Sequence, residues 1–423
     1  MAFTINEQPT SLAYSRSPVL YQVYDTNTVT YSDYRYSMKV YIWEGAIASI
    51  PGTASFELLR YPNSSGSAYF NIQQLCDEYF VSQNPTIADQ FHDDMIYNLY
   101  AVFGNYYDDG EGYNYHEEEL SNVVQFVHGY TGYPNGINYT NPGNTGQSYP
   151  TAYAQRVSDD GGEVESIGCI PDELSPLTGG EFMTDIPRNM ILPENQRYTM
   201  SLYYKKTTSK VQDVIVWDDN SNTYTFDLSV IVTASDSSEK FVLTLDVGSD
   251  KFNDYALSPT RYWYVQGFDD KGLEVTQKYT FETTCVSKWG YTQLQFINKY
   301  GVWDYIPCWG KASEELMATR KRFHRDTLTV GQATIGYNIY DAPKRDYNIK
   351  GDIGLKINTG WLHEDYAEVL SQMYLSDFIV DQSTLLPYNV KGNMLPILNF
   401  TNDKLLNWTI DMEEAYKTIN SVG

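Results

Sequence analysis

Alternation of apolar and polar residues in the middle of the chain is the feature that most limits what it can fold into. Every second residue is apolar in two neighbouring runs, which are Tyr224, Phe226, Leu228, Val230 and Val232, and then Phe241, Leu243, Leu245 and Val247. A period of two residues gives a half-buried strand one apolar face. The polar segment 233–240 between the runs predicts a loop that joins them as a hairpin.

Short runs of the same kind recur along most of the chain. They predict strands at 19–24, 34–43, 55–61, 198–204, 211–217, 261–268, 275–283, 292–297 and 405–412. Short strands that follow one another every ~10–15 residues, with turns between them, are typical of an antiparallel β-sandwich. We therefore predict a mainly β chain with two antiparallel β-sandwich-like domains, a few short helices and a long loop-rich insertion.

Helical spacing of apolar residues interrupts the strands at three places. One helix is predicted near 71–81 with Asn71 as its cap, a second at 117–128 with Gly129 at its end, and a third at 362–373. The apolar stripe of the second helix consists of Leu120, Val123, Val124 and Val127. All three helices are short compared with the strand-forming part of the chain.

These elements divide the chain into four predicted parts. Residues 1–128 form an N-terminal β-rich domain with helices near 71–81 and 117–128, residues 196–320 a β-sandwich, and residues 321–423 a C-terminal mixed α/β segment. The segment 129–195 is rich in Gly, Pro, Asn, Thr and Ser and shows little periodicity. We interpret it as a loop-rich arm or insertion that a neighbouring subunit orders, and a flexible interdomain linker is the alternative.

The charge balance excludes some classes of partner. The chain of 423 residues has 29 lysines and arginines against 54 aspartates and glutamates, and a formal net charge of −25. Such a chain repels phosphate backbones and anionic lipids, so we expect no nucleic-acid partner and no membrane partner. No apolar run approaches the ~18 residues of a membrane-spanning helix, and the first residues lack the features of a secretory signal.

The cysteines point to a structural role. Cys76, Cys169, Cys285 and Cys308 show no CxxC spacing, which is unfavourable for a zinc cage or a disulfide framework. We expect buried thiols in a chain made in a reducing cytosol. Cys285 and Cys308 are the two that neighbouring strands could bring together.

Motifs for catalysis or metal binding are missing from the sequence. The five histidines form no HxH or HExxH pattern, and there is no GxSxG, GxxxxGK[ST] or strand-linked GxGxxG motif. The acidic run 108–119 fails as an EF-hand, because Tyr107 and His116 would occupy ligand positions, and a solvated loop is preferred to a surface cation site. No pair of carboxylates stands out for glycoside hydrolysis. We therefore expect no catalytic residue, no metal site, no cofactor and no enzymatic activity.

Tyrosine is the most over-represented residue. The chain has 39 Tyr, 17 Phe and 8 Trp, which together make 15% of its residues. Tyrosine favours strands and is enriched at protein interfaces, because it buries much surface while it keeps a polar tip. We therefore predict a protein that acts through large interfaces, as a dimer or a higher homo-oligomer. A tyrosine-rich β protein with no special partner is the alternative.

Two groups of residues are the candidate interface sites. The first is a basic cluster that interrupts the acidic chain, with Arg320, Lys321, Arg322 and Arg325. It fits an acidic surface such as a second copy of this chain, and a solvated strand edge protected by charge is the alternative. The second group is an aromatic turn with Tyr300, Trp303 and Tyr305, where Leu294 and Phe296 face a core and residues 298–301 reverse the chain.

The segment around this turn also carries a resemblance to a known family. Residues 294–305 read LQFINKYGVWDY, which resembles a pattern in structural proteins of tailed bacteriophages, where a strand ends in F-L/I-N-x-x-G-x-W/Y-D-Y/F and turns back. Residues 18–25, 36–43 and 405–412 are similar to the same proteins, and 61–195 has no counterpart. The resemblance is strongest to virion components of the crAss-like phages that infect gut Bacteroidetes.

This resemblance implies a β-sandwich-rich particle protein without catalysis. A head-fibre or capsid-vertex component is the first expectation and a tail or neck component the second. Its partners would be other virion proteins, such as capsid, fibre or tail subunits, and its place the virion after synthesis in the cytoplasm of the host bacterium. A carbohydrate-binding adhesin that attaches to a host surface glycan is the alternative, and a wall- or capsule-degrading enzyme is the third hypothesis.

Overall fold

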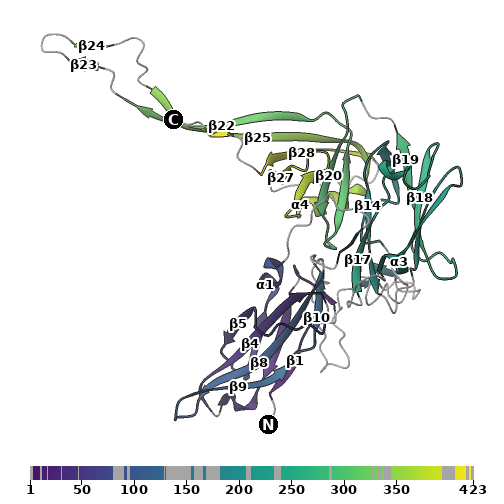
Figure 1. Cartoon of the computed structure of the whole chain (residues 1–423). Coiled ribbons are helices and arrows are strands. Elements are labelled where there is room, and N and C mark those ends of the chain that lie inside the picture. The colour runs from purple at the N-terminus through teal and green to yellow at the C-terminus, as the bar shows by residue number, and fades with distance from the viewer. Residues whose placement is uncertain are drawn as a thin grey trace. The chain divides into compact units, whose positions relative to one another are not determined.

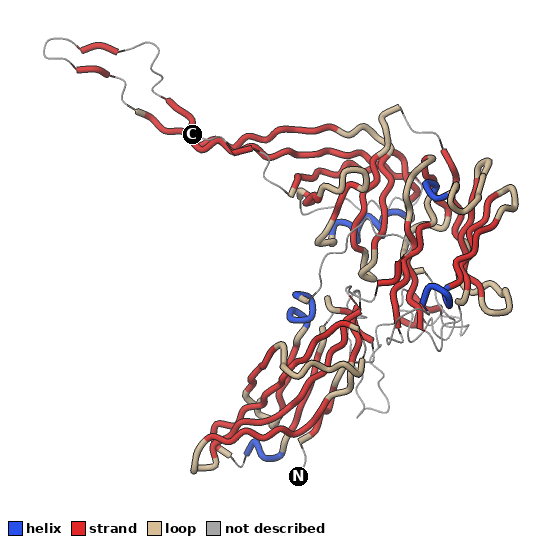
Figure 2. The backbone as a smooth tube through the Cα atoms, viewed as in Figure 1, coloured by secondary structure: helices blue, strands red, loops and turns tan. Residues whose placement is uncertain are grey.

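The computed structural model describes nineteen segments of the chain, which are residues 3–9, 12–16, 18–29, 31–45, 47–79, 90–92, 96–127, 129, 154–156, 165–167, 182–205, 211–232, 240–284, 288–325, 328–330, 335–337, 344–392, 405–415 and 419–420. They form several mostly antiparallel sheets with a few short helices, which confirms the predicted mainly β fold class (Figures 1 and 2). Most of the predicted arm 129–195 lies outside these residues. Within it, β11 (Ala154–Arg156) pairs antiparallel with β12 (Glu165–Ile167).

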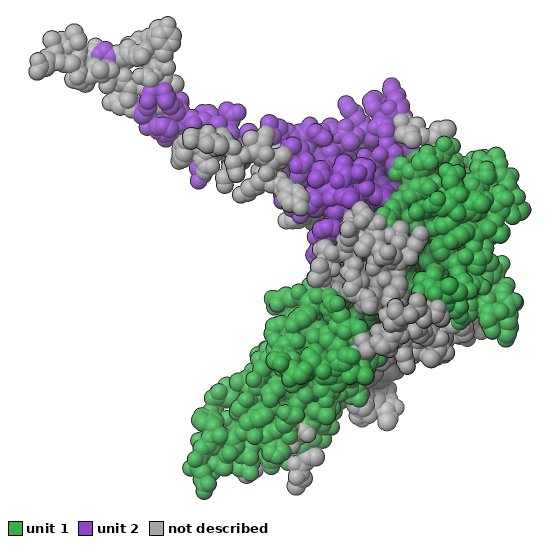
Figure 3. Space-filling view, in the orientation of Figure 1, with its two compact units in different colours: residues 1–285, 297–304 green, residues 286–296, 305–423 purple. Residues whose placement is uncertain are grey.

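The chain divides into two compact units. Unit 1 consists of Met1–Cys285 together with Ile297–Asp304, and unit 2 of Val286–Phe296 together with Tyr305–Gly423 (Figure 3). The chain therefore leaves unit 1, returns to it for one short turn, and leaves it again.

The N-terminal part of unit 1 is a β-sandwich. One sheet has the order β1-β3-β6, and its strands are β1 (Thr4–Glu7), β3 (Leu20–Tyr24) and β6 (Ser67–Asn71). The other has the order β2-β10-β8-β4-β5, with β9 also paired to β8. Its strands are β2 (Leu12–Tyr14), β4 (Ser32–Glu44), β5 (Phe56–Arg60), β8 (Ile96–Asp108), β9 (Tyr113–Leu120) and β10 (Val124–Val127).

Aromatic side chains join the two sheets of this sandwich. Phe103 of β8 is completely buried, and its ring centroid lies 5.5 Å from that of Tyr21 and 6.0 Å from that of Phe70. Tyr21 belongs to β3 and Phe70 to β6, so these contacts cross from one layer to the other. Burial of a large apolar side chain of this kind stabilises a fold by ~1.5–3 kcal/mol.

The first predicted helix is present in shortened form. Helix α1 (Gln73–Glu78) begins where the Asn71 side chain accepts a hydrogen bond from the Gln73 amide at 3.1 Å, and Cys76 is buried. Positions 80 and 81 of the prediction lie outside the described residues. A 3₁₀ turn, η1 (Thr26–Val29), connects β3 to β4.

The predicted helix at 117–128 is wrong, because residues 117–120 belong to strand β9 and residues 124–127 to strand β10, and residue 128 lies outside the described residues. All four residues of β10 are buried, and the strand lies between β2 and β8 in the sheet. A strand that is covered on both faces loses its alternation, and its apolar run then matches a helical stripe as well as it matches a strand.

A second group of sheets in unit 1 contains the middle of the chain. One sheet has the order β13-β19-β18-β15-β16, with β13 (Asn189–Pro193), β15 (Asp213–Asp218), β16 (Thr223–Asp227), β18 (Tyr262–Phe268) and β19 (Tyr279–Thr284). The other has the order β14-β17-β7, with β7 (Gln90–His92), β14 (Thr199–Lys205) and β17 (Lys240–Asp246). A 3₁₀ turn, η2 (Ser249–Lys251), follows β17.

Trp263 is the centre of this second core. It is completely buried, stacks on Phe281 with ring centroids 4.9 Å apart, and meets Phe252 edge-on at 5.0 Å. Its indole N–H donates to the Val247 carbonyl at 3.1 Å, so its one polar atom is satisfied inside the core.

The predicted hairpin between residues 223 and 247 is wrong. β16 pairs with β15, whereas β17 pairs with β14 and β7 in the other sheet. The second half of the first run forms a helical turn, α3 (Leu228–Val232), because the Asp227 side chain accepts from the amides of Ser229 and Val230 at 3.0 and 3.2 Å. This is the hydrogen bonding of a helix N-cap, and it overrides the alternation.

Unit 2 is built on one sheet with the order β21-β20-β26-β27-β28-β25-β22, with β29 also paired to β25. Its strands are β20 (Thr292–Ile297), β21 (Trp303–Cys308), β22 (Ser313–His324), β25 (Lys344–His363), β26 (Ile379–Asp381), β27 (Pro387–Val390), β28 (Leu405–Glu414) and β29 (Ile419–Asn420). Helix α4 (Tyr366–Tyr374) buries Leu370 and Met373. The strands predicted at 292–297 and 405–412 are thus confirmed. The helix predicted at 362–373 is confirmed from Tyr366 onward, whereas Leu362 and His363 belong to strand β25.

Candidate functional site

The basic cluster lies on a long hairpin at one edge of the unit 2 sheet. β22 and β25 run side by side and are followed by the short pair β23 (Leu328–Val330) and β24 (Ile335–Tyr337), as Figure 1 shows. We call residues 320–325 and 344–350 of this hairpin the basic arm. It contains seven lysines and arginines and a single acidic residue, Asp346.

That single carboxylate organises one face of the basic arm. Asp346 accepts from Arg322 Nε at 2.8 Å and from Arg320 at 3.4 Å, and the hydrogen bond from Arg322 lowers the pKa of the Asp346 carboxyl. The Arg320 and Arg322 side chains remain 55% and 59% exposed. Both guanidinium groups therefore keep donors directed to the surface while the carboxylate fixes their position.

The opposite face of the basic arm combines charge with an aromatic ring. Lys321 and Phe323 alternate with the two arginines along β22, and Arg345 lies opposite Phe323 in the strand register. Phe323 is 42% exposed, and Lys321 and Arg345 are exposed. Both faces of the ribbon are thus accessible, and both present cationic side chains.

The basic arm also has fewer paired strands beside it than the rest of β25 in the described structure. β28 pairs with residues 354–363 of β25, and β29 with residues 350 and 351. Among the described strands, residues 344–349 pair with β22 alone. A two-stranded ribbon is marginally stable in water by itself, so this segment gains most from a surface to lie on.

The aromatic turn is a core element and not a surface. Tyr300, Trp303 and Tyr305 are only 5%, 5% and 1% exposed. This corrects the expectation that they form an interface, since buried side chains have no surface to offer a partner. The predicted chain reversal itself is confirmed: Asn298 Oδ1 accepts from the Tyr300 and Val302 amides, at 2.9 and 3.2 Å.

A buried acid holds this turn in unit 1. Asp304 accepts from Asn298 Nδ2 and from the Thr184 hydroxyl, both at 2.8 Å. Burial raises the pKa of the Asp304 carboxyl to about 8. Asp185 lies nearby, paired with Lys299 at 2.5 Å. Because Asp304 and Asn298 are buried and both carboxylate oxygens of Asp304 have protein partners, we interpret this cluster as structural.

The outer face of the N-terminal sandwich is a surface that sequence reasoning missed. Six tyrosines lie on it, from the three adjacent strands β4, β8 and β9 and from the residue that follows β5: Tyr41, Tyr61, Tyr100, Tyr106, Tyr113 and Tyr115. The register places Tyr41 opposite Tyr100, and Tyr106 opposite Tyr115. We call this surface the tyrosine face. Tyr61 and Tyr113 are 62% and 67% exposed.

Ionic and aromatic contacts fix the tyrosine face in place. Tyr106 and Tyr115 have ring centroids 4.7 Å apart, and Lys39 Nζ lies 4.4 Å above the Tyr115 ring. Tyr113 donates to Asp33 at 2.6 Å, and this hydrogen bond, followed by that from Arg35, lowers the pKa of the Asp33 carboxyl. Ordered side chains lose little entropy on binding, which favours recognition.

A glycine makes room for this arrangement. A Cβ on Gly104 would lie 2.6 Å from the His116 carbonyl oxygen and 3.0 Å from the Tyr115 ring. The ring therefore lies over β8 only because position 104 has no side chain. The sequence does place Tyr113 and Tyr115 two residues apart, as on one face of a strand, but the helix predicted at 117–128 overlaps the same strand β9.

In the acidic run 108–119, carboxylates accept hydrogen bonds that stabilise a turn. Asp108 and Asp109 accept from the amides of Gly110 and Glu111, each at 2.9 Å, and Asp109 also accepts from the Asn114 side chain at 2.7 Å. Among the described residues, no three His, Cys, Asp or Glu side chains are grouped as metal ligands. We therefore interpret this run as the acidic tip of the hairpin that β8 and β9 form.

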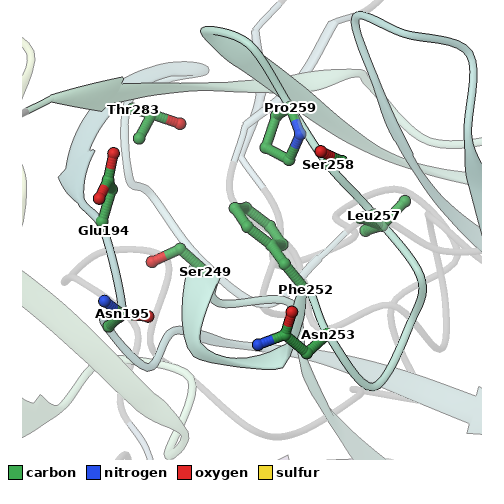
Figure 4. Close-up of a pocket in the computed structure, with 9 residues that line it drawn as sticks. All are labelled: Glu194, Asn195, Ser249, Phe252, Asn253, Leu257, Ser258, Pro259 and Thr283. Atoms are coloured by element: carbon green, nitrogen blue, oxygen red, sulfur yellow. The ribbon is translucent and has the colours of Figure 1, made fainter.

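One shallow cavity of about 230 Å³ lies beside Phe252 in unit 1 (Figure 4). Ser249 at its wall donates to the Pro193 carbonyl and accepts from the Gln196 amide, both at 2.8 Å, so this hydroxyl is part of the backbone scaffold. Glu194 is the one ionisable residue in the lining. The cavity therefore lacks the paired acid and base of a hydrolytic site.

Comparison with known proteins adds no family. A search against protein-family models and a search against curated proteins both find no match for this chain. None of the helices in the described part of the chain is long and apolar enough to cross a membrane. The basic arm and the tyrosine face are the two exposed surfaces of the described chain that suit a binding partner.

Proposed function

We propose that this chain is a structural component of a bacteriophage virion that acts through protein–protein interfaces, as a head-fibre or capsid-vertex protein. The resemblance of residues 294–305 to virion proteins of tailed phages supports the phage context. The basic arm is the observation that carries the structural role, because an exposed two-stranded ribbon has a clear use as a docking element and none in catalysis.

The chemistry of the described surfaces agrees with a binding role. The tyrosine face and the basic arm present aromatic rings and guanidinium groups, which are the groups enriched where proteins bind each other. The cavity beside Phe252 has no catalytic constellation. A tail or neck position in the particle would use the same surfaces, so it is the alternative within the same class.

Purified particles provide the test of this proposal. We expect mass spectrometry of purified virions to find the chain in stoichiometric amounts, and light scattering coupled to size-exclusion chromatography to find a dimer or larger oligomer of the isolated protein. Obligate assemblies of this kind bury about 2,000 Å² or more. Absence of the chain from purified particles would contradict the proposal.

A carbohydrate-binding adhesin is a second candidate, favoured by exposed tryptophans. Trp361 and Trp289 are 70% and 56% exposed, and flat indole rings suit stacking on sugars. Binding of the purified chain to a glycan array, lost in Trp361→Ala or Trp289→Ala and retained in a distant exposed variant such as Leu273→Ala, would favour this candidate over the structural one.

A further inference from the structure

We infer that the basic arm of one copy binds the tyrosine face of a second copy together with residues 106–119 beside it, which we call the acidic hairpin. This rests on the proposed structural role and names the partner and both surfaces. The arm and the face belong to different units, and each is accessible in the described structure. Charge, side-chain chemistry and geometry each support this contact.

Charge is the first argument. The basic arm has seven lysines and arginines against one aspartate, in a chain whose net charge is −25. Residues 106–119 comprise the end of β8, the turn after it and most of β9, and they contain six acidic residues and no lysine or arginine. Clusters of opposite charge thus lie on these two surfaces, and complementary potentials steer and orient association.

Side-chain chemistry is the second argument. Arginine stacks favourably on aromatic rings, and tyrosine offers a ring and a hydroxyl to the same partner. The tyrosine face already shows this contact within the chain, since Arg35 lies 5.0 Å from the Tyr61 ring centroid. The basic arm supplies exposed arginines at 320, 322 and 345 for such a contact, and the Tyr113 ring of the face is 67% exposed.

Geometry is the third argument. The arm is a two-stranded ribbon with exposed side chains on both faces, and the tyrosine face presents exposed rings such as Tyr61 and Tyr113, so a second copy can reach both surfaces. Different surfaces meet in such a contact, which makes it heterologous: each copy offers an arm to one neighbour and a face to another. The expected product is therefore a ring or an open chain of copies.

Two charge-reversal variants test the contact. Lys321→Glu/Lys344→Glu changes the arm, and Glu111→Lys/Glu117→Lys changes the acidic hairpin; all four side chains are exposed. We expect each variant to weaken self-association by roughly ten-fold or more, because several ion pairs become repulsive. Lys271→Glu/Lys311→Glu and Asp270→Lys/Glu274→Lys alter the net charge equally at other exposed positions and should leave association unchanged.

A mixture of the two variants separates this contact from contacts within one chain. The arm variant keeps an intact face and the hairpin variant keeps an intact arm, so we expect the mixture to form a one-to-one complex in analytical ultracentrifugation. An arm that folds onto its own chain would give no such complex. Absence of the complex, or variants that associate like the wild type, overturns the inference.

The outcomes distinguish this inference from the proposed function. If the wild-type chain is an oligomer and a virion component but resists the charge reversals, the arm-to-face contact is wrong and the structural role stands. If the chain is absent from particles yet associates through these surfaces, the contact stands and the virion role is wrong. A wild-type chain that stays monomeric at all concentrations, or a face that binds glycans in place of the arm, overturns the contact.

Discussion

At the residue scale, Asp304 shows how one buried carboxyl makes stability depend on pH. The folded chain holds its proton to about pH 8, whereas the ordinary carboxyl value is 3.8. Raising the pH over this range therefore favours the unfolded state, which releases the proton first. The neighbouring groups, Asp185 and Lys299, pair with each other and so leave the burial of Asp304 as the main cause.

The variant Asp304→Asn removes this titration. We expect the difference in free energy of unfolding, wild type minus Asp304→Asn, to be larger at pH 5 than at pH 8. Both values lie above the ordinary carboxyl pKa of 3.8, and the upper one is near the raised pKa of about 8 in the folded chain. Urea unfolding at both pH values measures this difference. An equal difference at the two pH values would contradict the assignment, and Asp270→Asn in an exposed turn is the matched control.

Gly104 tests how the tyrosine face is built. We expect Gly104→Ala to destabilise the N-terminal sandwich by ~1–3 kcal/mol, because the new Cβ collides with the backbone of β9 and with the Tyr115 ring. Denaturant unfolding measures the loss. Gly52→Ala is the control, since its Cβ would meet no atom within 4 Å. Equal stability of the two variants would show that β9 moves aside freely.

At the scale of elements, α4 (Tyr366–Tyr374) gives the simplest packing test. Leu370 is completely buried, and we expect Leu370→Ala to lower the free energy of unfolding by ~2–5 kcal/mol through the lost burial and the cavity that remains. Leu375 at the end of the same helix is 58% exposed, so Leu375→Ala should change stability far less. Comparable losses, measured by thermal or urea unfolding, would contradict this packing.

Prediction from sequence succeeded where an element has one exposed and one buried side. β28 alternates strictly between exposed and buried residues from Leu405 to Met412, and its strand pattern was read correctly. β10 is buried throughout, and there the apolar run was mistaken for a helix. The alternation that stops at Asp227 failed for a different reason, since a side-chain cap changed the backbone direction locally.

Some of the candidate surfaces could be predicted from the sequence and others could not. The charges of the basic arm were visible because like charges cluster along the sequence. The tyrosine face was not, because its residues come from separate strands, and only the register brings Tyr41 beside Tyr100. The aromatic turn looked like a surface because tyrosine and tryptophan suit interfaces, yet a β core can bury both when their polar atoms find partners.

At the scale of the whole molecule, the acidic excess controls solubility. The isoelectric point of the sequence is about 4.5, so we expect maximal light scattering near that pH and clear solutions at pH 7, where the charge is −25. The variant Lys321→Glu/Lys344→Glu should move the maximum to lower pH. A maximum that does not follow the calculated charge would contradict this account.

The path of the chain between its units sets the order in which the protein can be completed during synthesis. Unit 1 includes Ile297–Asp304, which a ribosome makes only after it has passed Cys285 and the first residues of unit 2. At about 5–20 residues per second, the last part of unit 1 arrives roughly one to four seconds after residue 285. A gene fragment cut at residue 285 would therefore encode a protein that lacks Asp304, which accepts from the Thr184 hydroxyl, and Asn298, which donates to the Met183 carbonyl.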